Sequence, residues 1–519
     1  MRRITDHRFE ENSFNESIQG LVRNAPWWMI SIALHGVVLF ALWTIPFKIT
    51  VTETSVNLQA VPTPKIEEAE DPKVEELEPV LPEDNIVEKP VFDDNVDTHS
   101  EADTDDEFQE TAYTDGDANA PFSGEFDNPV IGTGGNAGGG PDGRGGSKNV
   151  GAEGGSKYTE NAVMAGLEWL KKHQDVDDSG AWDCDDFMKH DPAHDKCTGA
   201  GKAHYDPGVS GLALLAYLGA GFTDRGTDND NPYARTVRNG LRYLITIQDD
   251  EGCFGPRASQ HFMYNHAIAT LAMAEAYWMT RNPRYKKPAQ EGLNFIAMAR
   301  NPYLAWRYDP RGGENDTSVT GWMVMALKSG KFGGLDIDPD AFEGARAWVD
   351  KMTDAEFGQV GYVQAGGQAA RPEGLQDRFP AEKSQSMTSV GMLTRILMGE
   401  DPRQSAMIKK GANLCLEALP SWNTDDGSID MYYWYYGTLA MFQVGGAPWR
   451  KWNEAMKGAI VKHQHPRNSG SKTGSWDPIG PWGPDGGRVY STATMVMCLE
   501  VYYRYDRVVG LTRRSTRNR

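Results

Sequence analysis

The sequence predicts an all-α protein that forms an (α/α)6 toroid, preceded by one transmembrane helix and a disordered linker. Two kinds of helical segment alternate six times after residue 158, one uninterrupted apolar stretch lies near the N-terminus, and the residues between them have little to bury. We therefore expect a cytoplasmic N-terminal segment, a transmembrane helix, a linker, the toroid and a basic C-terminal tail, in that order: 1–26, 27–47, 48–157, 158–508 and 509–519.

The apolar stretch 27–47 reads WWMISIALHGVVLFALWTIPF and contains no Asp, Glu, Lys or Arg. It is long enough for a helix to cross the roughly 30 Å hydrocarbon core of a bilayer. Arginines precede it, and no small-residue cleavage site follows, so we expect an uncleaved anchor with a cytoplasmic N-terminus. The prediction is a single-pass cytoplasmic-membrane protein whose toroid lies outside, on the periplasmic side.

Ser31 and His35 lie four residues apart, so they share one face of this helix. The pattern S-x-x-x-H in a single N-terminal span resembles the anchor of TonB-type energy-transducing proteins. In that family the pair faces a proton-driven motor complex, so the resemblance implies such a membrane partner. A plain anchor that tolerates one Ser and one His is the alternative, and no TonB-like C-terminal domain follows.

The predicted linker is rich in Pro, Glu and Asp at first and then in Gly, as in GTGGNAGGGPDGRGGSKNVGAEGGS at 132–156. Such compositions favour a disordered, flexible tether. The chain has a net charge of −21, and most of the acidic excess lies in this N-terminal part. Phosphate binding requires a clustered basic surface, so no nucleic-acid partner is expected.

The six repeats each contain an amphipathic helix with a small residue before bulky ones, and then a helix that is apolar nearly all round. The first kind is expected on an outer ring, and the second, buried on both sides, lines the centre. The outer segments contain 166–170, 240–244, 292–296, 344–348, 411–415 and 458–462. The inner segments are 208–221, 264–279, 317–330, 386–399, 432–446 and 490–505.

Three loops after outer helices carry a Gln and then a Gly-x-aromatic triplet: Gln174 with GAW at 180–182, Gln248 with GCF at 252–254, and Gln464 with GSW at 474–476. This pattern resembles the QW motif of the squalene cyclase and protein prenyltransferase superfamily, and the resemblance spans residues 158–508. It implies the toroid fold. Uncharacterised, membrane-anchored bacterial members with these repeats offer no reaction to transfer.

The catalytic signatures of that superfamily are missing or misplaced. Residues 175–178 read DVDD, which matches the proton-donor tetrad of the cyclases, but they lie inside a QW turn. A cyclase acid must be dry and face the cavity, whereas a carboxylate on the rim is solvated. No D-x-C precedes an inner helix as a prenyltransferase zinc site requires, and no C-x-E-Q thioester motif is present.

The loop CDDFMKHDPAHDKC at 184–197 brings two of the five cysteines close together in sequence. Cys184 and Cys197 are the candidate disulfide, given the expected extracytoplasmic location. Free thiols are a second possibility. A metal site formed by Cys184, His190, His194 and Cys197 is a weaker one, because Pro192 opposes a helix between the histidines.

The starts of the inner helices are expected to meet at one end of the toroid and to form the mouth of a central cavity. Polar and aromatic groups around a concave mouth are the default prediction for a ligand site. The candidate residues are His261, Tyr264, His266, Glu314, Asp316, Asp430, Tyr432, Tyr433, Arg488 and Tyr490.

The leading hypothesis is a membrane-tethered domain that binds a ligand or partner, of apolar or isoprenoid character, in this cavity. No recognisable catalytic set is present, and no cofactor is predicted. An isoprenoid-processing enzyme resembling a terpene cyclase or prenyltransferase is the alternative, followed by a glycan-processing enzyme. If the protein is catalytic, Asp316 and Asp430 are the first candidates, although helix capping explains each of them separately.

Overall fold

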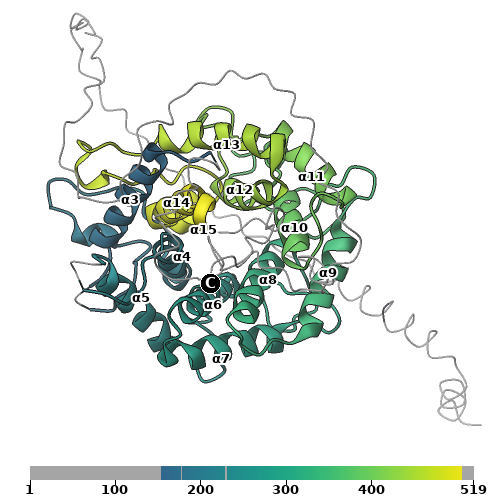
Figure 1. Cartoon of the computed structure of the whole chain (residues 1–519), viewed down its shortest axis with the longest axis horizontal. Helices are drawn as coiled ribbons and strands as arrows, with labels where there is room; N and C mark the ends of the chain where they lie inside the picture. Colours follow the sequence, from purple (N-terminus) through teal and green to yellow (C-terminus); the bar gives the residue numbers. More distant parts are fainter. Residues whose placement is uncertain (1–34, 36–153, 177, 228–230, 505–519) are drawn as a thin grey trace, which may run out of the picture. The chain divides into compact units, whose positions relative to one another are not determined.

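The computed structural model describes His35 and residues 154–176, 178–227 and 231–504, and their main helices form two concentric rings (Figure 1). The outer ring consists of α3 (Lys157–Lys172), α5 (Ala234–Thr246), α7 (Pro283–Ala299), α9 (Pro339–Met352), α11 (Ala406–Glu417) and α13 (Gly446–Val461). The inner ring consists of α4 (Asp206–Gly219), α6 (Phe262–Thr280), α8 (Thr317–Phe332), α10 (Ser386–Leu397), α12 (Met431–Val444) and α14 (Gly483–Leu499).

The inner ring is closed. Each inner helix packs against the next one along the chain, and α14 packs against α4. The first outer helix, α3, packs mainly on the last inner helix, α14, so the two ends of the domain meet. Within the described residues there is no strand, only two isolated β-bridges. The predicted toroid is confirmed.

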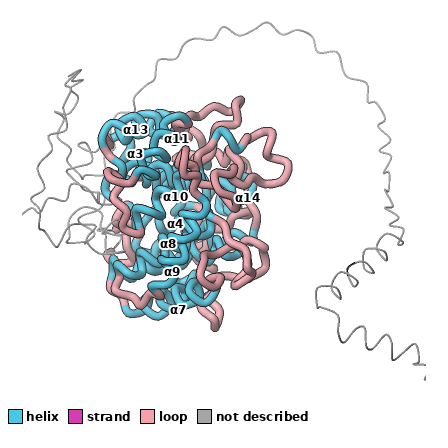
Figure 2. The backbone as a smooth tube through the Cα atoms, turned by 90° about the vertical axis from the view of Figure 1, so that its right-hand side faces the viewer, coloured by secondary structure: helices cyan, strands magenta, loops and turns pink. Residues whose placement is uncertain are grey.

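The connections differ in length according to their direction. Most of those from an inner helix to the next outer helix are short, such as Arg281–Asn282, although 220–233 between α4 and α5 is an exception; those from an outer helix to its inner partner are all long. The long loops gather at one side of the helical layer (Figure 2). This side also carries the N-terminal ends of the inner helices, so the loops surround the mouth of the toroid.

The three QW turns share one hydrogen-bond pattern. The side-chain amide of Gln174 donates to the carbonyl oxygens of Gly180, in its own turn, and Thr236, in α5, both at 2.9 Å. Gln248 does the same with Gly252 and with Pro288 of α7. Gln464 donates to Gly474 and to Ala162 of α3, both at 2.8 Å. Each turn therefore binds the next outer helix, and the last turn binds the first.

The repeated glycines of the outer helices allow this close approach. A Cβ atom on Gly240 would lie 2.7 Å from the ring of Trp182, and one on Gly292 would lie 2.8 Å from the ring of Phe254. A Cβ atom on Gly166 would lie 3.2 Å from the Trp476 ring and 2.4 Å from Val496. The aromatic ring of each turn thus packs on the glycine of the following outer helix.

The turn glycine is required for two reasons. Gly180 has a φ of +82°, which residues with side chains rarely adopt. A Cβ atom there would also lie 2.6 Å from the backbone oxygen of Asn239. The preceding residues Asp175 and Asp178 lie in the same turn, where Asp175 is half-buried and Asp178 is exposed. The acidic tetrad is therefore a spacer of the turn, as the repeat predicts.

The predicted membrane helix 27–47, most of the linker and the basic tail 509–519 lie outside the described residues, and so does Ser31. His35 is the only described residue of the anchor and has helical conformation. Among the described residues, no helix is both long enough and apolar enough to span a bilayer. The anchor and its resemblance to TonB-type proteins remain predictions.

Replacing Gln174 with Ala should lower the free energy of unfolding by about 1–3 kcal/mol, because two buried carbonyl oxygens would lose their donor. Urea denaturation of the purified protein, followed by circular dichroism, measures this change. Gln404→Ala is the matched control, since the Gln404 side chain is exposed. Equal urea midpoints for the two variants would show that the amide does not hold the turn.

Candidate functional site

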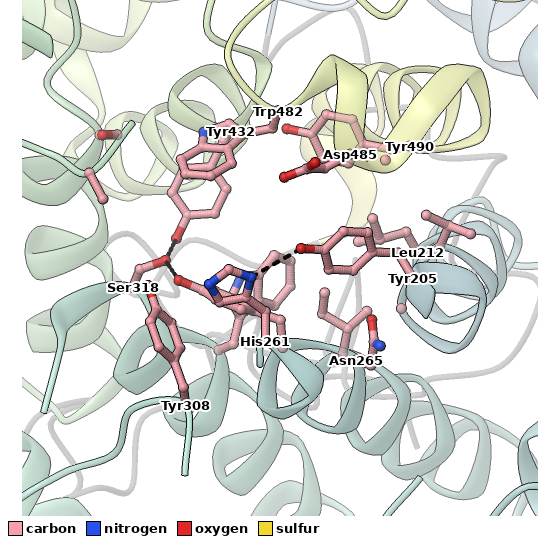
Figure 3. Close-up of a pocket in the computed structure, with 18 of the residues that line it drawn as sticks. Tyr205, Leu212, His261, Asn265, Tyr308, Ser318, Tyr432, Trp482, Asp485 and Tyr490 are labelled. Atoms are coloured by element: carbon pink, nitrogen blue, oxygen red, sulfur yellow. Dashed lines mark hydrogen bonds between the residues drawn. The ribbon is translucent and has the colours of Figure 1, made fainter. Parts of the chain in front are cut away.

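A cavity opens at the N-terminal end of the inner ring and is lined by the first turns of all six inner helices (Figure 3). It contains about 920 Å³ of empty space, including the solvent at its mouth. Pockets that bind small molecules commonly have volumes of about 300–1,000 Å³. Its aromatic lining comprises Tyr205, His261, Tyr264, Tyr308, Trp322, Tyr362, Tyr432, Trp482 and Tyr490.

The hydroxyl groups in the wall hold one another in place. Tyr264, in the first turn of α6, donates to Ser318 Oγ of α8 at 2.8 Å. Ser318 Oγ also lies 2.7 Å from the hydroxyl of Tyr432 in α12. Tyr308 and Tyr362, from two different loops, are joined through their hydroxyl groups. Hydrogen bonds between repeats therefore hold these aromatic rings in fixed orientations at the cavity wall.

Among the described residues, the cavity lining contains one histidine, His261, and one carboxylate, Asp485. The Tyr205 hydroxyl lies 3.1 Å from Nδ1 of His261 (Figure 3). Burial lowers the pKa of His261 below its ordinary value, while the nearby Asp485 carboxylate opposes this shift. Asp485 forms a salt bridge with Lys202. Asp485 is the only carboxylate among the described residues that line the cavity.

Three polar groups of the lining have no hydrogen-bond partner within the described part of the chain. They are the hydroxyl of Tyr490, the indole N–H of Trp482 and the hydroxyl of Ser386, and all three atoms are buried. Tyr490 and Trp482 come from α14 or the turn before it, and Ser386 is the first residue of α10. A buried polar group without a partner is costly, so these groups are suited to bonding with a molecule inside the cavity.

Four of the ten residues predicted at the mouth line the cavity: His261, Tyr264, Tyr432 and Tyr490. The other six do not line it, because each points outward, caps a helix or is buried between helices. Glu314 points outward, with 73% of its side chain exposed, and pairs with Arg307. The sequence pattern located the correct end of the toroid but did not separate the residues that face inward from their neighbours.

Asp316 and Asp430, the first catalytic candidates, are N-caps. Asp316 Oδ1 accepts from the backbone N–H of Val319 at 2.7 Å, and Asp430 Oδ1 accepts from that of Tyr433 at 3.1 Å. Asp430 Oδ2 is also bound by Ser384, at 2.8 Å, and by Arg371, at 3.0 Å. Neither carboxylate lines the cavity, so neither is placed to protonate a molecule in it.

His266, Tyr433 and Arg488 are buried structural residues. His266 lies one turn inside α6, which begins earlier than predicted; its Nδ1 accepts from the N–H of Phe254 at 3.1 Å, and its Nε2 lies 3.1 Å from the carbonyl of Gly292. Burial lowers its pKa to about 3. Tyr433 bonds to the Cys415 carbonyl. Arg488 donates to the carbonyl of Thr198 at 2.7 Å and to Ser475.

The sequence interpretation missed several lining residues. Tyr308 and Tyr362 come from the long loops after α7 and α9, where no periodicity indicates a direction. Trp482 and Asp485 were missed because α14 begins at Gly483, before the predicted start near Tyr490. The spacing i, i+4 was a usable signal for Trp322, which follows Ser318 on one face of α8.

The predicted disulfide between Cys184 and Cys197 is wrong, because both residues are free thiols in the structure. The two sulfur atoms point to different partners. Cys184 Sγ lies 3.3 Å from the carbonyl oxygens of Asp485 and Gly486, whereas Cys197 Sγ lies 3.8 Å from Nε2 of His173. Closeness along the loop does not bring these sulfurs together, because the chain between them winds through a short 3-10 helix, η2 (Phe187–His190).

The weaker prediction of a metal site formed by Cys184, His190, His194 and Cys197 is also wrong. His190 and His194 are exposed, while both cysteines are buried. The side chains near Cys197 that could hold a metal are instead His173 and Asp191. His173 is the residue that follows α3, so it lies outside the loop on which the prediction was based.

No family model and no curated protein matches the chain. Its helical domain resembles several solved structures. The match to an α-1,6-mannanase of Salegentibacter sp. HEL1_6 covers 67% of this chain and 99% of the mannanase, with 15% identity and a TM-score of 0.45. The match to a type II terpene cyclase, MstE from Scytonema, covers 66% of this chain and 97% of the cyclase, with 12% identity and a TM-score of 0.41. The match to cellobiose 2-epimerase from Bacillus thermoamylovorans B4167 covers 67% of this chain and 98% of the epimerase, with 14% identity and a TM-score of 0.44.

The chain is an (α/α)6 toroid. This conclusion comes from its own closed ring of inner helices, and the squalene-cyclase-like repeat pattern fits it. The similar structures include a mannanase, a cyclase and an epimerase, at TM-scores below 0.5, so no activity is transferred from them. The function has to be argued from the cavity itself.

Asp316 should make stability depend on pH. Burial raises its pKa from 3.8 to about 7, so its contribution to stability is fully present below about pH 4 and is lost as the pH rises through about 7. Asp316→Asn keeps a capping side chain without the charge. Relative to wild type, its free energy of unfolding should therefore rise between pH 4 and 7, by up to ~1.4 kcal/mol per pH unit.

Denaturation at a series of pH values measures this difference. Asp338→Asn is the matched control, because Asp338 also caps a helix, α9, but is only half-buried. A constant difference between wild type and Asp316→Asn across this range would contradict the assignment.

Proposed function

We propose that the toroid is a ligand-binding domain whose central cavity takes up an apolar molecule that carries a hydrogen-bonding group. The observation that carries this proposal is the set of three buried, unpartnered polar atoms, Tyr490 OH, Trp482 Nε1 and Ser386 Oγ, in a mainly aromatic and aliphatic wall. The wall provides an apolar surface, and these atoms give the ligand a fixed orientation. A prenyl alcohol has this combination of properties.

The cavity favours binding over chemistry because its acids are in the wrong places. Protonation of an alkene needs a protonated acid in a dry site, but Asp485 is paired with Lys202. Glycoside hydrolysis usually needs two carboxyl groups across the bond to be cleaved, and the described lining contains one. The candidates Asp316 and Asp430 are occupied in helix caps.

An isoprenoid-processing enzyme is the second candidate, supported by the aromatic faces around the cavity. The rings of Tyr432, Tyr490 and Trp322 can stabilise a passing positive charge by about 1–2 kcal/mol each in a desolvated site. In that case His261 and Asp485 are the groups to test as proton carriers. The difference between the candidates is turnover, which the binding proposal does not include.

We further propose that the domain is tethered outside the cytoplasmic membrane by residues 27–47. The uncharged apolar stretch and the arginines before it support this topology. If a motor complex is the partner, Ser31 and His35 form the contact. The toroid then samples ligands within the reach of a long Gly-rich and acidic tether.

Binding should be measured with a long-chain prenyl alcohol, squalene and a manno-oligosaccharide, by calorimetry and by the fluorescence of the lining tryptophans. We expect the prenyl alcohol to bind. Trp322→Ala should weaken its binding about tenfold or more, through lost apolar contact, and Tyr490→Phe about two- to tenfold, through one lost hydrogen bond. We also expect the prenyl alcohol to be recovered unchanged after incubation with the protein.

Two matched controls leave the cavity intact. Trp422→Ala removes a ring that stacks on His463, and Tyr303→Phe removes an exposed hydroxyl. Binding of the oligosaccharide alone would favour the glycan alternative, and conversion of the prenyl alcohol would favour the enzyme. Equal losses in Trp322→Ala and Trp422→Ala would place the binding elsewhere.

The topology can be tested with reporters fused after residue 519. An enzyme that is active only outside the cytoplasm should be active there, and deletion of 27–47 should abolish its activity. A reporter that is active only in the cytoplasm should give the reverse result. Cytoplasmic activity of the full-length fusion would contradict the proposed location.

A further inference from the structure

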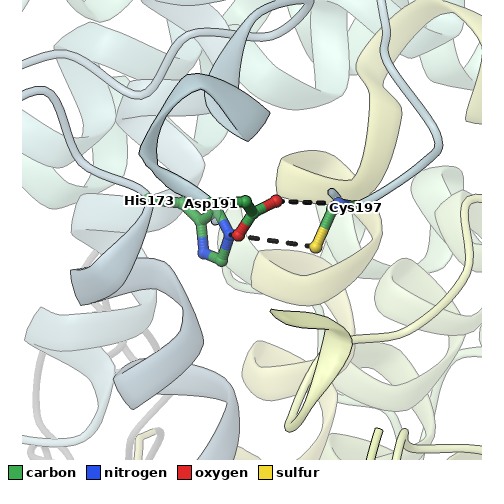
Figure 4. A group of neighbouring side chains, drawn as sticks. All are labelled: His173, Asp191 and Cys197. Carbon is green, nitrogen blue, oxygen red and sulfur yellow. Dashed lines mark hydrogen bonds and ion pairs between the residues drawn. The ribbon is translucent and has the colours of Figure 1, made fainter. Parts of the chain in front are cut away.

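A second group of reactive side chains lies away from the cavity. His173, Asp191 and Cys197 come from the end of α3 and from the loop that leads to α4, and their ligand atoms converge (Figure 4). The Nε2 atom of His173 lies 2.9 Å from Asp191 Oδ1 and 3.8 Å from Cys197 Sγ. The side chains of His173 and Asp191 are 3% and 4% exposed, and Cys197 is 4% exposed.

The imidazole of His173 is oriented by its other nitrogen. Nδ1 lies 2.8 Å from the carbonyl oxygen of Trp169, so this nitrogen carries the proton and donates it to the carbonyl. In a neutral imidazole, Nε2 then has its lone pair directed at a carboxylate oxygen and a sulfur. A histidine that binds a metal is usually held in this way, by a hydrogen bond from its other nitrogen to a carbonyl or carboxylate group.

The same arrangement argues against a catalytic triad. In a Cys–His–Asp triad the thiol faces one ring nitrogen and the carboxylate orients the other. Here both groups face Nε2, and Nδ1 is taken by the backbone. Three donor atoms directed at a common point are arranged to surround an ion rather than to transfer a proton in sequence.

We propose that His173, Asp191 and Cys197 form a binding site for a divalent transition-metal ion, with Zn²⁺ as the ion that the donors favour. The three ligand atoms lie within 4.8 Å of one another. Zinc bonds to N, O and S ligands are about 2.0–2.3 Å long, so one ion can reach all three. A mixed set of imidazole, carboxylate and thiolate suits this ion better than Ca²⁺ or Mg²⁺.

The second sphere of the site is also built. The Asp191 Oδ2 atom accepts the backbone N–H of Cys197 at 2.8 Å, which fixes the carboxylate and the chain that carries the thiol. The Trp169 ring stacks on the His173 ring, with centroids 4.0 Å apart, and Phe187 packs edge-on against both. These rings exclude solvent and hold the imidazole in one orientation.

The site lies where the first and last repeats meet. The loop between His173 and Cys197 contacts the last QW turn, because Asp195 Oδ2 accepts the N–H of Ser471 at 2.7 Å. The indole of Trp169 donates to the Ser471 carbonyl at 2.9 Å. A metal that joins α3 to the end of this loop would therefore stabilise the closure of the ring.

The test uses the purified full-length chain, saturated with Zn²⁺, dialysed and analysed for metal by mass spectrometry. We expect about one equivalent of zinc per chain and a melting temperature that falls when a chelator removes it. Cys197→Ser and Asp191→Asn should lower zinc affinity about tenfold or more. His190→Ala and Cys253→Ser are matched controls: the first removes an exposed histidine of the same loop, and the second a buried free thiol elsewhere.

A second measurement does not depend on variants. Co²⁺ added to the metal-free wild-type chain should give the near-ultraviolet charge-transfer band of a cobalt–thiolate bond. If zinc is absent after dialysis and cobalt gives no such band, the cluster is an ordinary buried His–Asp pair beside a thiol, and the proposal is wrong. Bound cobalt without the band would exclude Cys197 as a ligand and overturn the site as assigned.

Discussion

The structure depends on the contact that each QW turn makes with the outer helix of the next repeat. A Gln side chain bridges two backbone carbonyl oxygens, a glycine with positive φ brings the two backbones together, and an aromatic ring packs on a helix glycine. No repeat can satisfy this contact alone. The last turn makes this contact with α3, through Gln464 and Ala162. The contact between the last and first repeats therefore closes the ring.

The closed ring explains why the cavity exists and why it contains little chemistry. The first turns of six inner helices must face one another at one end, and their N–H groups need acceptors. Asp316 and Asp430 meet that need, which removes them from the cavity. Tyrosine hydroxyls from several repeats remain: Tyr264 and Tyr432 both bond to Ser318, and Tyr308 bonds to Tyr362. Such a wall is shaped for recognition, since its polar groups are few and fixed.

The sequence was sufficient for the fold because the repeat is a physical unit that recurs, and glycine and aromatic positions mark its contacts. It was less informative about the site. Periodicity does not show whether a polar residue in a first turn faces the cavity or its own helix N–H groups, and so Asp316 was misread. Tyr308 and Tyr362 reach the wall from loops without a regular pattern. The cysteine prediction failed because it was limited to one loop, whereas the partner of Cys197 is His173, at the end of α3.

Ring closure also has a consequence for synthesis on the ribosome. The hydrogen bond between Gln464 and Ala162 joins residues 302 positions apart, so it can form only after the first five repeats have been synthesised. A nascent chain with only five helix pairs lacks α14, so it exposes the apolar surfaces of α4 and α12 that α14 covers in the complete ring. The cavity is not yet closed at this stage. The domain must stay unsealed, and vulnerable to aggregation, until its final repeat is made.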